Sequence, residues 1–174
     1  MNKSEQTKQG LRKSFESGMS KKASVVCYGY ERDKNDSLII NEAEANAVRM
    51  IYAGYLKGLS LGKIVDLLFC KDIISPSGKE KWNRETVDKV LSNEKYTGSV
   101  MLGKSIYENG KQISTDITDR VIYENSHPAI ISRELYDMVQ VEKQKRSRTN
   151  AKSSPNKRKN VEKIADDIIK STVL

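Results

Sequence analysis

The chain has 174 residues, enough for one ordinary domain with a hydrophobic core or for two small ones. Hydrophobic residues make up 37% of it and charged residues 31%, and no apolar run is long enough to span a bilayer, so we expect no membrane anchor. The formal net charge of +8 leaves two interpretations, a polyanionic partner such as nucleic acid or solubilising basic tails.

The N-terminal region predicts a helix followed by a linker. Residues 3–17 carry a thin apolar stripe at helical spacing. Alone this helix would bury little, so we expect it to continue from, or pack on, another structure. Residues 19–26 have no helical period and are typical of an exposed linker, with two basic side chains, Lys21 and Lys22. No apolar secretion signal precedes them, so we expect a cytoplasmic protein.

Three short helices are predicted next. Asn41 and Glu44 have the spacing of a capping box and open the first helix, which Gly58 ends. Ser60 caps the second helix and Asn83 caps the third. Their apolar stripes are Ala47, Val48, Ile51 and Tyr55, then Ile64, Leu67 and Leu68, then Val87, Val90 and Leu91.

The segment before the third helix has strong turn chemistry in residues 75–78, which read Ser-Pro-Ser-Gly. Trp82 is expected to anchor the third helix to the core. A sharp corner between the first two helices favours a relative of the helix-turn-helix, but the link before the third helix is much longer than the usual turn. The pattern therefore predicts a divergent version of that motif.

Strand-like alternation follows the helices, over residues 99–102, 104–107, 111–117 and 121–123. Asn109 and Gly110 form a hairpin signal between two of these strands. Ser132 caps a last helix whose inner face is expected to carry Leu135, Met138 and Val139. The predicted fold class is α+β: a divergent helix-turn-helix three-helix subdomain, then a small antiparallel sheet and a C-terminal helix.

The positive charge is concentrated at the two ends of the chain. Residues 1–26 carry a net +4 and residues 142–163 a net +7, whereas residues 27–141 carry −2. Residues 147–160 contain almost nothing apolar and are expected to be disordered without a partner. A nearly neutral module with two basic arms is what a protein that wraps a polyanion would show.

The sequence offers no catalytic or metal-binding constellation. It has no nucleophile-elbow, P-loop, dinucleotide-binding or HExxH motif. Its single histidine, His127, precedes a proline and is interpreted as a loop-locking residue, while Cys27 and Cys70 are expected to be buried thiols. We therefore expect no catalytic residue, no metal and no cofactor.

Donor-rich side chains cluster around the start of the third helix. That end of a helix carries backbone amides suited to phosphate, and Asn and Arg can pair with base edges in a major groove. The alternative is an ordinary solvated face, which Glu85 and Asp88 favour because they would repel phosphate. The candidate DNA-binding residues here are Ser77, Lys79, Lys81, Asn83, Arg84, Thr86 and Lys89.

Six motifs occur in an order that is more specific than any one of them. They are Tyr28-Gly29-Tyr30, NEAEANAVRMI at 41–51, Gly58-Leu59-Ser60, Ser75-Pro76-Ser77-Gly78 before Trp82, VLSNEKYTG at 90–98 and HPAIISREL at 127–135. Over residues 24–146 the sequence resembles the recombinase domain of large serine recombinases, the integrases and transposon resolvases of mobile elements.

The resemblance implies three segments: the end of an interdomain helix with a basic linker (1–23), a DNA-binding recombinase domain (24–146) and a basic tail (147–174). The family's catalytic serine domain and zinc ribbon are expected to be absent, so this chain would not itself be an enzyme. Cys27 also stands where the family often has proline.

The resemblance also implies how DNA is held. Lys21 and Lys22 would cross the minor groove, and the helix that begins at Asn83 and Arg84 would enter the major groove of an attachment half-site. Other recombinase subunits would be met through the absent domains, with no membrane and no small-molecule substrate involved.

Two rival interpretations stay open. The chain could be a truncated relic or a free-standing DNA-binding regulator of the same fold. More distantly, it could be a basic RNA-binding protein, although no aromatic RNP-type strand motif is present.

Overall fold

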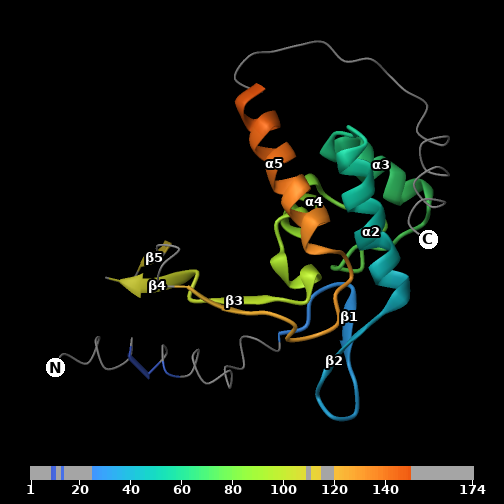
Figure 1. The fold of residues 1–174 in the computed structure, drawn as a ribbon. Coiled ribbons are helices and arrows are strands. Elements are labelled where there is room, and N and C mark those ends of the chain that lie inside the picture. Colours follow the sequence, from blue (N-terminus) through green and yellow to red (C-terminus); the bar gives the residue numbers. More distant parts are fainter. Residues whose placement is uncertain (1–8, 11–12, 14–24, 109–110, 115–119, 150–174) are drawn as a thin grey trace.

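The computed structural model describes residues 9–10, 13, 25–108, 111–114 and 120–149. Within described residues 25–149, four α-helices cluster at one side of the molecule, and short strands precede and separate them (Figure 1). The helices are α2 (Glu42–Leu56), α3 (Leu61–Cys70), α4 (Arg84–Leu91) and α5 (Arg133–Thr149), with a short 3₁₀ helix, η1 (Glu94–Thr97), after α4. Most of the helix predicted over residues 3–17 lies outside the described residues, as do Lys21, Lys22, Asn109 and Gly110.

The start of α2 shows how local and distant contacts combine. The Asn41 side chain caps the helix by accepting a hydrogen bond from the Glu44 amide at 3.2 Å. The Glu44 carboxylate does not return to Asn41 as in a capping box, because the Asn41 amide already donates to the Gly29 carbonyl. Glu44 instead accepts a hydrogen bond from the Gly29 amide at 2.7 Å. The cap therefore fixes the entering chain to α2.

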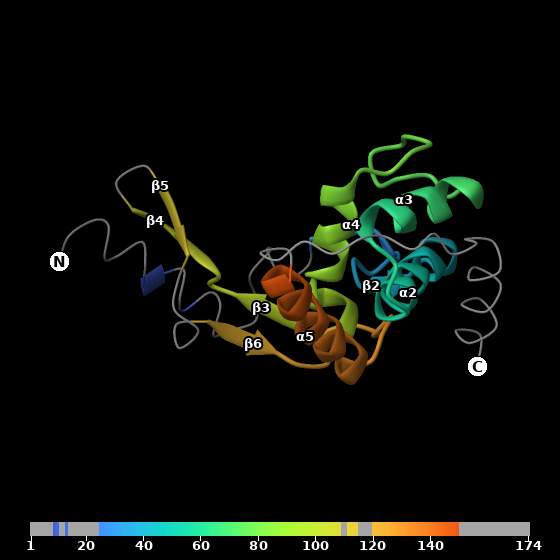
Figure 2. The ribbon, with the colours of Figure 1, turned by 90° about the horizontal axis from the view of Figure 1, so that it is seen from above.

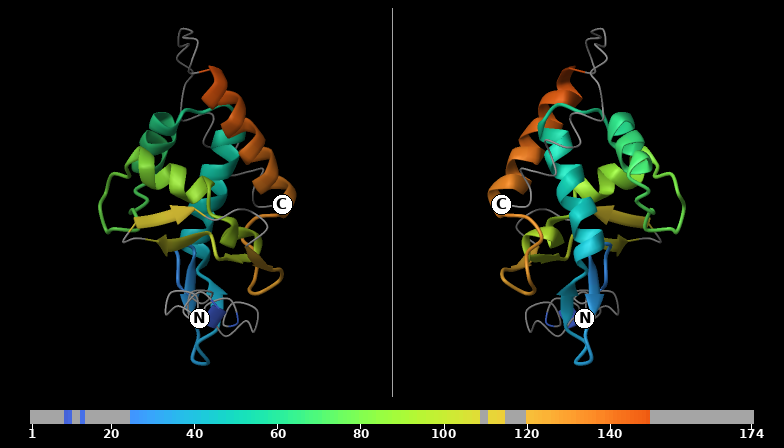
Figure 3. Two further views of the ribbon diagram at one scale, coloured as in Figure 1. Left: turned by 90° about the vertical axis from the view of Figure 1, so that its left-hand side faces the viewer. Right: turned by 90° about the vertical axis from the view of Figure 1, so that its right-hand side faces the viewer.

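The hydrophobic core lies between the helices and includes every apolar stripe residue predicted for α2, α3 and α4. Tyr52 of α2 is fully buried, and its hydroxyl donates to the Val90 carbonyl of α4 at 2.9 Å. Val139 brings α5 into the same core. The β1–β2 hairpin lies at the end of the molecule opposite the C-terminal end of α5 (Figure 3).

Arg146 of α5 closes the corner between α2 and α3. Its guanidinium donates to the carbonyls of Tyr55 and Leu59, each at 2.7 Å, and lies 4.0 Å from the centroid of the Tyr55 ring. The Leu59 carbonyl, in the link after α2, thereby gains a side-chain donor, and the Tyr55 carbonyl gains one besides the Gly58 amide, from which it accepts at 3.1 Å. The predicted sharp corner is present, with Gly58 at a φ of 91°.

The strands in the described part of the chain form three separate antiparallel pairs. They are β1 (Tyr30–Arg32) with β2 (Leu38–Ile40), β3 (Val100–Leu102) with β6 (Val121–Tyr123), and β4 (Ser105–Glu108) with β5 (Lys111–Ser114). The β4–β5 hairpin projects away from the helices (Figure 2). The antiparallel strands predicted after the helices are thus confirmed, but as two ladders, and the β1–β2 pairing was not predicted. The mixture of helices and small antiparallel sheets is α+β.

Three expectations need correction. Met138 is 52% exposed and does not share the inner face of α5 with Leu135 and Val139, which are one helical turn apart. Cys70 is exposed at the last position of α3, so a buried thiol is wrong there; Cys27 is half-buried. Finally, α5 continues to Thr149, so residues 147–149, which were expected to be disordered, are helical.

Candidate nucleic-acid interface

The start of α4 is held firmly by its neighbours. Trp82, just before the helix, is buried, and its indole nitrogen donates to the Ile73 carbonyl at 3.0 Å. The Tyr28 ring meets it edge-on at 5.1 Å between centroids. The next residue, Asn83, is exposed and caps α4, with its Oδ1 accepting a hydrogen bond from the Thr86 amide at 2.6 Å. The predicted anchor and cap are both confirmed.

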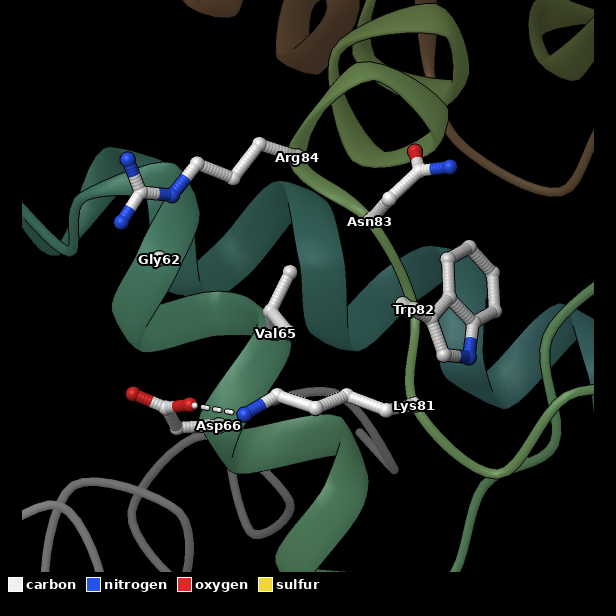
Figure 4. A pocket seen from close by; sticks show the side chains of 7 residues that line it. All are labelled: Gly62, Val65, Asp66, Lys81, Trp82, Asn83 and Arg84. Carbon is white, nitrogen blue, oxygen red and sulfur yellow. Dashed lines mark ion pairs between the residues drawn. The ribbon is translucent and has the colours of Figure 1, made fainter.

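An open pocket of about 220 Å³ separates the start of α4 from the first turns of α3 (Figure 4). On one side the Lys81 ammonium lies 3.5 Å from the Asp66 carboxylate and 5.7 Å from the centroid of the Phe69 ring. On the other side Arg84 extends across to α3. The lining residues are Gly62, Val65, Asp66, Lys81, Trp82, Asn83 and Arg84.

Arg84 is exposed, and its side chain runs from the first residue of α4 toward the N-terminal turn of α3 (Figure 4). Its guanidinium lies beside Gly62 of α3. Two cationic side chains, those of Lys81 and Arg84, therefore flank Asn83 and are both steered by contacts with α3.

The acidic residues of α4 differ in their surroundings. Asp88 pairs with Lys143 of α5 at 2.7 Å, and the same ammonium donates to the Ser92 hydroxyl at 2.6 Å. Its negative charge is thus compensated within the fold. Glu85 is exposed on the helix. Of the two acidic side chains expected to oppose phosphate, Asp88 is thus paired with a cation.

The remaining predicted site residues are more dispersed. Ser77 and Lys79 lie in the turn between α3 and α4, where the Lys79 amide donates to the Ser75 hydroxyl at 2.9 Å. Thr86 and Lys89 lie further along α4, half-exposed and exposed. The structure brings together Lys81, Asn83 and Arg84 and leaves these four outside the pocket.

Four pocket residues were not among the candidate DNA-binding residues from the sequence: Gly62, Val65, Asp66 and Trp82. Of these, Gly62 and Asp66 of α3 each contact a basic residue that was predicted, Arg84 and Lys81 respectively. The Ser60 cap correctly placed Gly62 in the first turn of a helix. No local pattern, however, indicated that this turn would pack beside the start of α4.

His127 has the environment of a structural residue. Its Nε2 donates to the Lys95 carbonyl at 2.7 Å, and the Tyr30 ring lies edge-on at 4.9 Å between centroids. Burial lowers the pKa of this imidazole, as does the nearby Lys95 ammonium. The loop-locking hydrogen bond expected from the sequence is confirmed.

The described part of the chain contains no group of three or more His, Cys, Asp or Glu side chains arranged to hold a metal ion. Within the same ranges, none of the helices combines the length and apolar character that crossing a membrane requires.

Comparison with known proteins gives a family and a fold. The family model described as Recombinase matches residues 42–146, which include α2, α3, α4 and α5 except its end. A solved structure of an LSR–DNA complex (LSR, large serine recombinase) superimposes with a TM-score of 0.55 at 21% sequence identity, over 87% of this chain and 42% of that one. The chain thus spans less than half the length of that relative, and the likeness concerns the fold. The match over residues 42–146 establishes that the chain belongs to the Recombinase family.

Proposed function

We propose that this chain binds duplex DNA in a sequence-specific manner, as the recombinase domain of a large serine site-specific recombinase that recognises an attachment half-site. One observation carries the proposal: in a chain of the Recombinase family, Lys81, Asn83 and Arg84 are exposed together at the capped start of α4. Side chains of these types at a helix start are those that read base edges and bind phosphates.

In this proposal α3 and α4 are the two helices of a divergent helix-turn-helix, and α4 enters the major groove with its N-terminus leading. Arg84 would pair with a guanine edge and Lys81 would bind a phosphate. Asn83 gives one Oδ1 lone pair to the helix cap, which leaves its second lone pair and its amide hydrogens for an adenine edge. Ser77, Lys79, Thr86 and Lys89 would add contacts around this centre.

Affinity would come mainly from the basic ends of the sequence. Residues 1–26 and 142–163 carry net charges of +4 and +7, against −2 for residues 27–141, and Lys21 and Lys22 would cross the minor groove. Such contacts release counterions from DNA and do not depend on its sequence. Binding would therefore weaken steeply with salt, whereas preference for particular bases would come from α4.

In this proposal the chain has three segments. Residues 1–23 are the end of an interdomain helix with a basic linker, residues 24–146 are the DNA-binding domain, and residues 147–174 are a basic tail. We assign no catalytic residue or cofactor, and we place DNA cleavage and pairing with other subunits in further domains of a cytoplasmic serine recombinase. The function of this chain is then to hold and identify the half-site.

The test is a selection from a pool of randomised DNA duplexes at low and moderate salt, with duplex RNA as competitor. We expect a DNA motif to be enriched and to survive the added salt. Uniform, salt-sensitive binding without enrichment would contradict sequence recognition, and equal competition by RNA would favour a basic RNA-binding protein instead.

A further inference from the structure

Gly62 lies directly against the Arg84 guanidinium. A Cβ atom at position 62 would lie 3.1 Å from Arg84 Nη2, 3.3 Å from Nε and 3.5 Å from Cζ. The first two distances are shorter than ordinary van der Waals contact, so a side chain here would force the guanidinium to move by a few tenths of an ångström. Because position 62 has no side chain, the Arg84 guanidinium can lie directly against α3.

The backbone gives no other reason for glycine at this position. Gly62 is helical, within α3, and its φ is not positive, unlike those of Gly58 and Gly78. Glycine inside a helix is unfavourable compared with alanine, because it loses more conformational freedom on folding. Outside the backbone of α3 itself, the three nearest neighbours of a Cβ at this position would all be atoms of Arg84.

We propose that Gly62 is a positioning residue that sets sequence preference by seating the guanidinium of Arg84; this inference rests on the proposed function. Arg84 is exposed and long, and on an open helix face it would sample many rotamers. The flat contact with α3 at Gly62 restricts these rotamers, and the Lys81–Asp66 pair limits the far side of the same pocket (Figure 4). A guanidinium held in this way meets a guanine edge at lower entropic cost.

The experiment compares the full chain with Gly62→Ala, using the duplex enriched from the randomised pool and duplexes that differ from it at single base pairs. We expect the melting temperature to equal or exceed that of the wild type, because alanine is the better helix former. Discrimination at one base position should fall on the order of tenfold, the scale of one bidentate base contact. Unchanged discrimination at every position would overturn the inference.

A double-mutant cycle shows whether the effect passes through Arg84. In the Arg84→Ala background the guanidinium is gone, so adding Gly62→Ala should change neither affinity nor discrimination. An equal loss from Gly62→Ala in both backgrounds would overturn the inference, including the case in which the alanine variant also folds less well. Failure of the proposed function is a separate result: the wild type itself would then enrich no motif.

Discussion

The Lys143 ammonium of α5 lies 2.7 Å from the Asp88 carboxylate of α4, so the C-terminal helix neutralises an acidic residue on the helix that we place in DNA. Removing that cation should leave Asp88 charged and facing phosphates. We therefore expect Lys143→Ala to weaken DNA binding several-fold, with a loss of stability of only about 0.5 kcal/mol, because the pair is partly exposed. Titration of the enriched duplex and denaturant unfolding measure the two effects.

Asp88→Asn separates this mechanism from a direct contact between Lys143 and DNA. If Lys143 acts by compensating Asp88, the double variant Lys143→Ala with Asp88→Asn should recover most of the lost affinity. A double variant that binds as poorly as Lys143→Ala alone would instead make Lys143 a phosphate ligand.

Arg84 and the linker lysines should differ in the kind of loss that they cause. Arg84→Ala is expected to weaken binding and to relax the choice of sequence at one position, at a cost of about 1–3 kcal/mol on the preferred duplex. Lys21→Ala together with Lys22→Ala should weaken binding to all duplexes alike and lower the salt slope. Titrations of preferred and unrelated duplexes at several salt concentrations measure the affinity, the sequence preference and the salt slope of each variant. An equal loss on every sequence for Arg84→Ala would refute its role in reading bases.

Much of the helical part of the fold could be predicted because its signals are local. Asn41, Ser60 and Asn83 each accept a hydrogen bond from an amide three residues ahead, so a short stretch of sequence identifies each helix start. The same holds for the apolar stripes, whose spacing defines the buried face of each helix. The third of these caps, Asn83, also located the centre of the candidate site.

Features that depend on contacts between distant segments could not be predicted in this way. The partner of β3 is β6 and not the strand that follows it, because the β4–β5 hairpin is inserted between them. Likewise, the hydrogen bond from the Gly29 amide to Glu44 and the ion pair between Asp88 and Lys143 form only once the helices have packed. The role of Gly62 belongs to this group, since it depends on which turn of α3 meets Arg84.

Arg146 should contribute more to stability than its half-exposed position suggests. Arg146→Met keeps much of the aliphatic contact but removes the donors to the Tyr55 and Leu59 carbonyls and the contact with the Tyr55 ring. We expect the free energy of unfolding to fall by about 2 kcal/mol, because the Leu59 carbonyl loses its side-chain donor and the Tyr55 carbonyl loses one of its donors. Gln144→Met, at an exposed position on the same helix, should change it by less than about 0.5 kcal/mol. Similar losses in both variants, measured by urea unfolding, would contradict a special role for Arg146.

His127 should make stability depend on pH. Burial lowers the pKa of this imidazole in the folded chain below its ordinary value of 6.5, so the folded state binds a proton less readily than the unfolded state. The stabilisation is therefore complete above about pH 6.5 and is lost as the pH falls from there toward the folded-state pKa. Urea unfolding between pH 7.5 and 5.5 should show this decline in the wild type, over a range in which most carboxylates stay ionised (about pH 5 and above).

His127→Gln keeps a neutral donor near the Lys95 carbonyl but does not titrate, so its stability should vary less over the same range. Equal pH dependence in both proteins would show that another group is responsible.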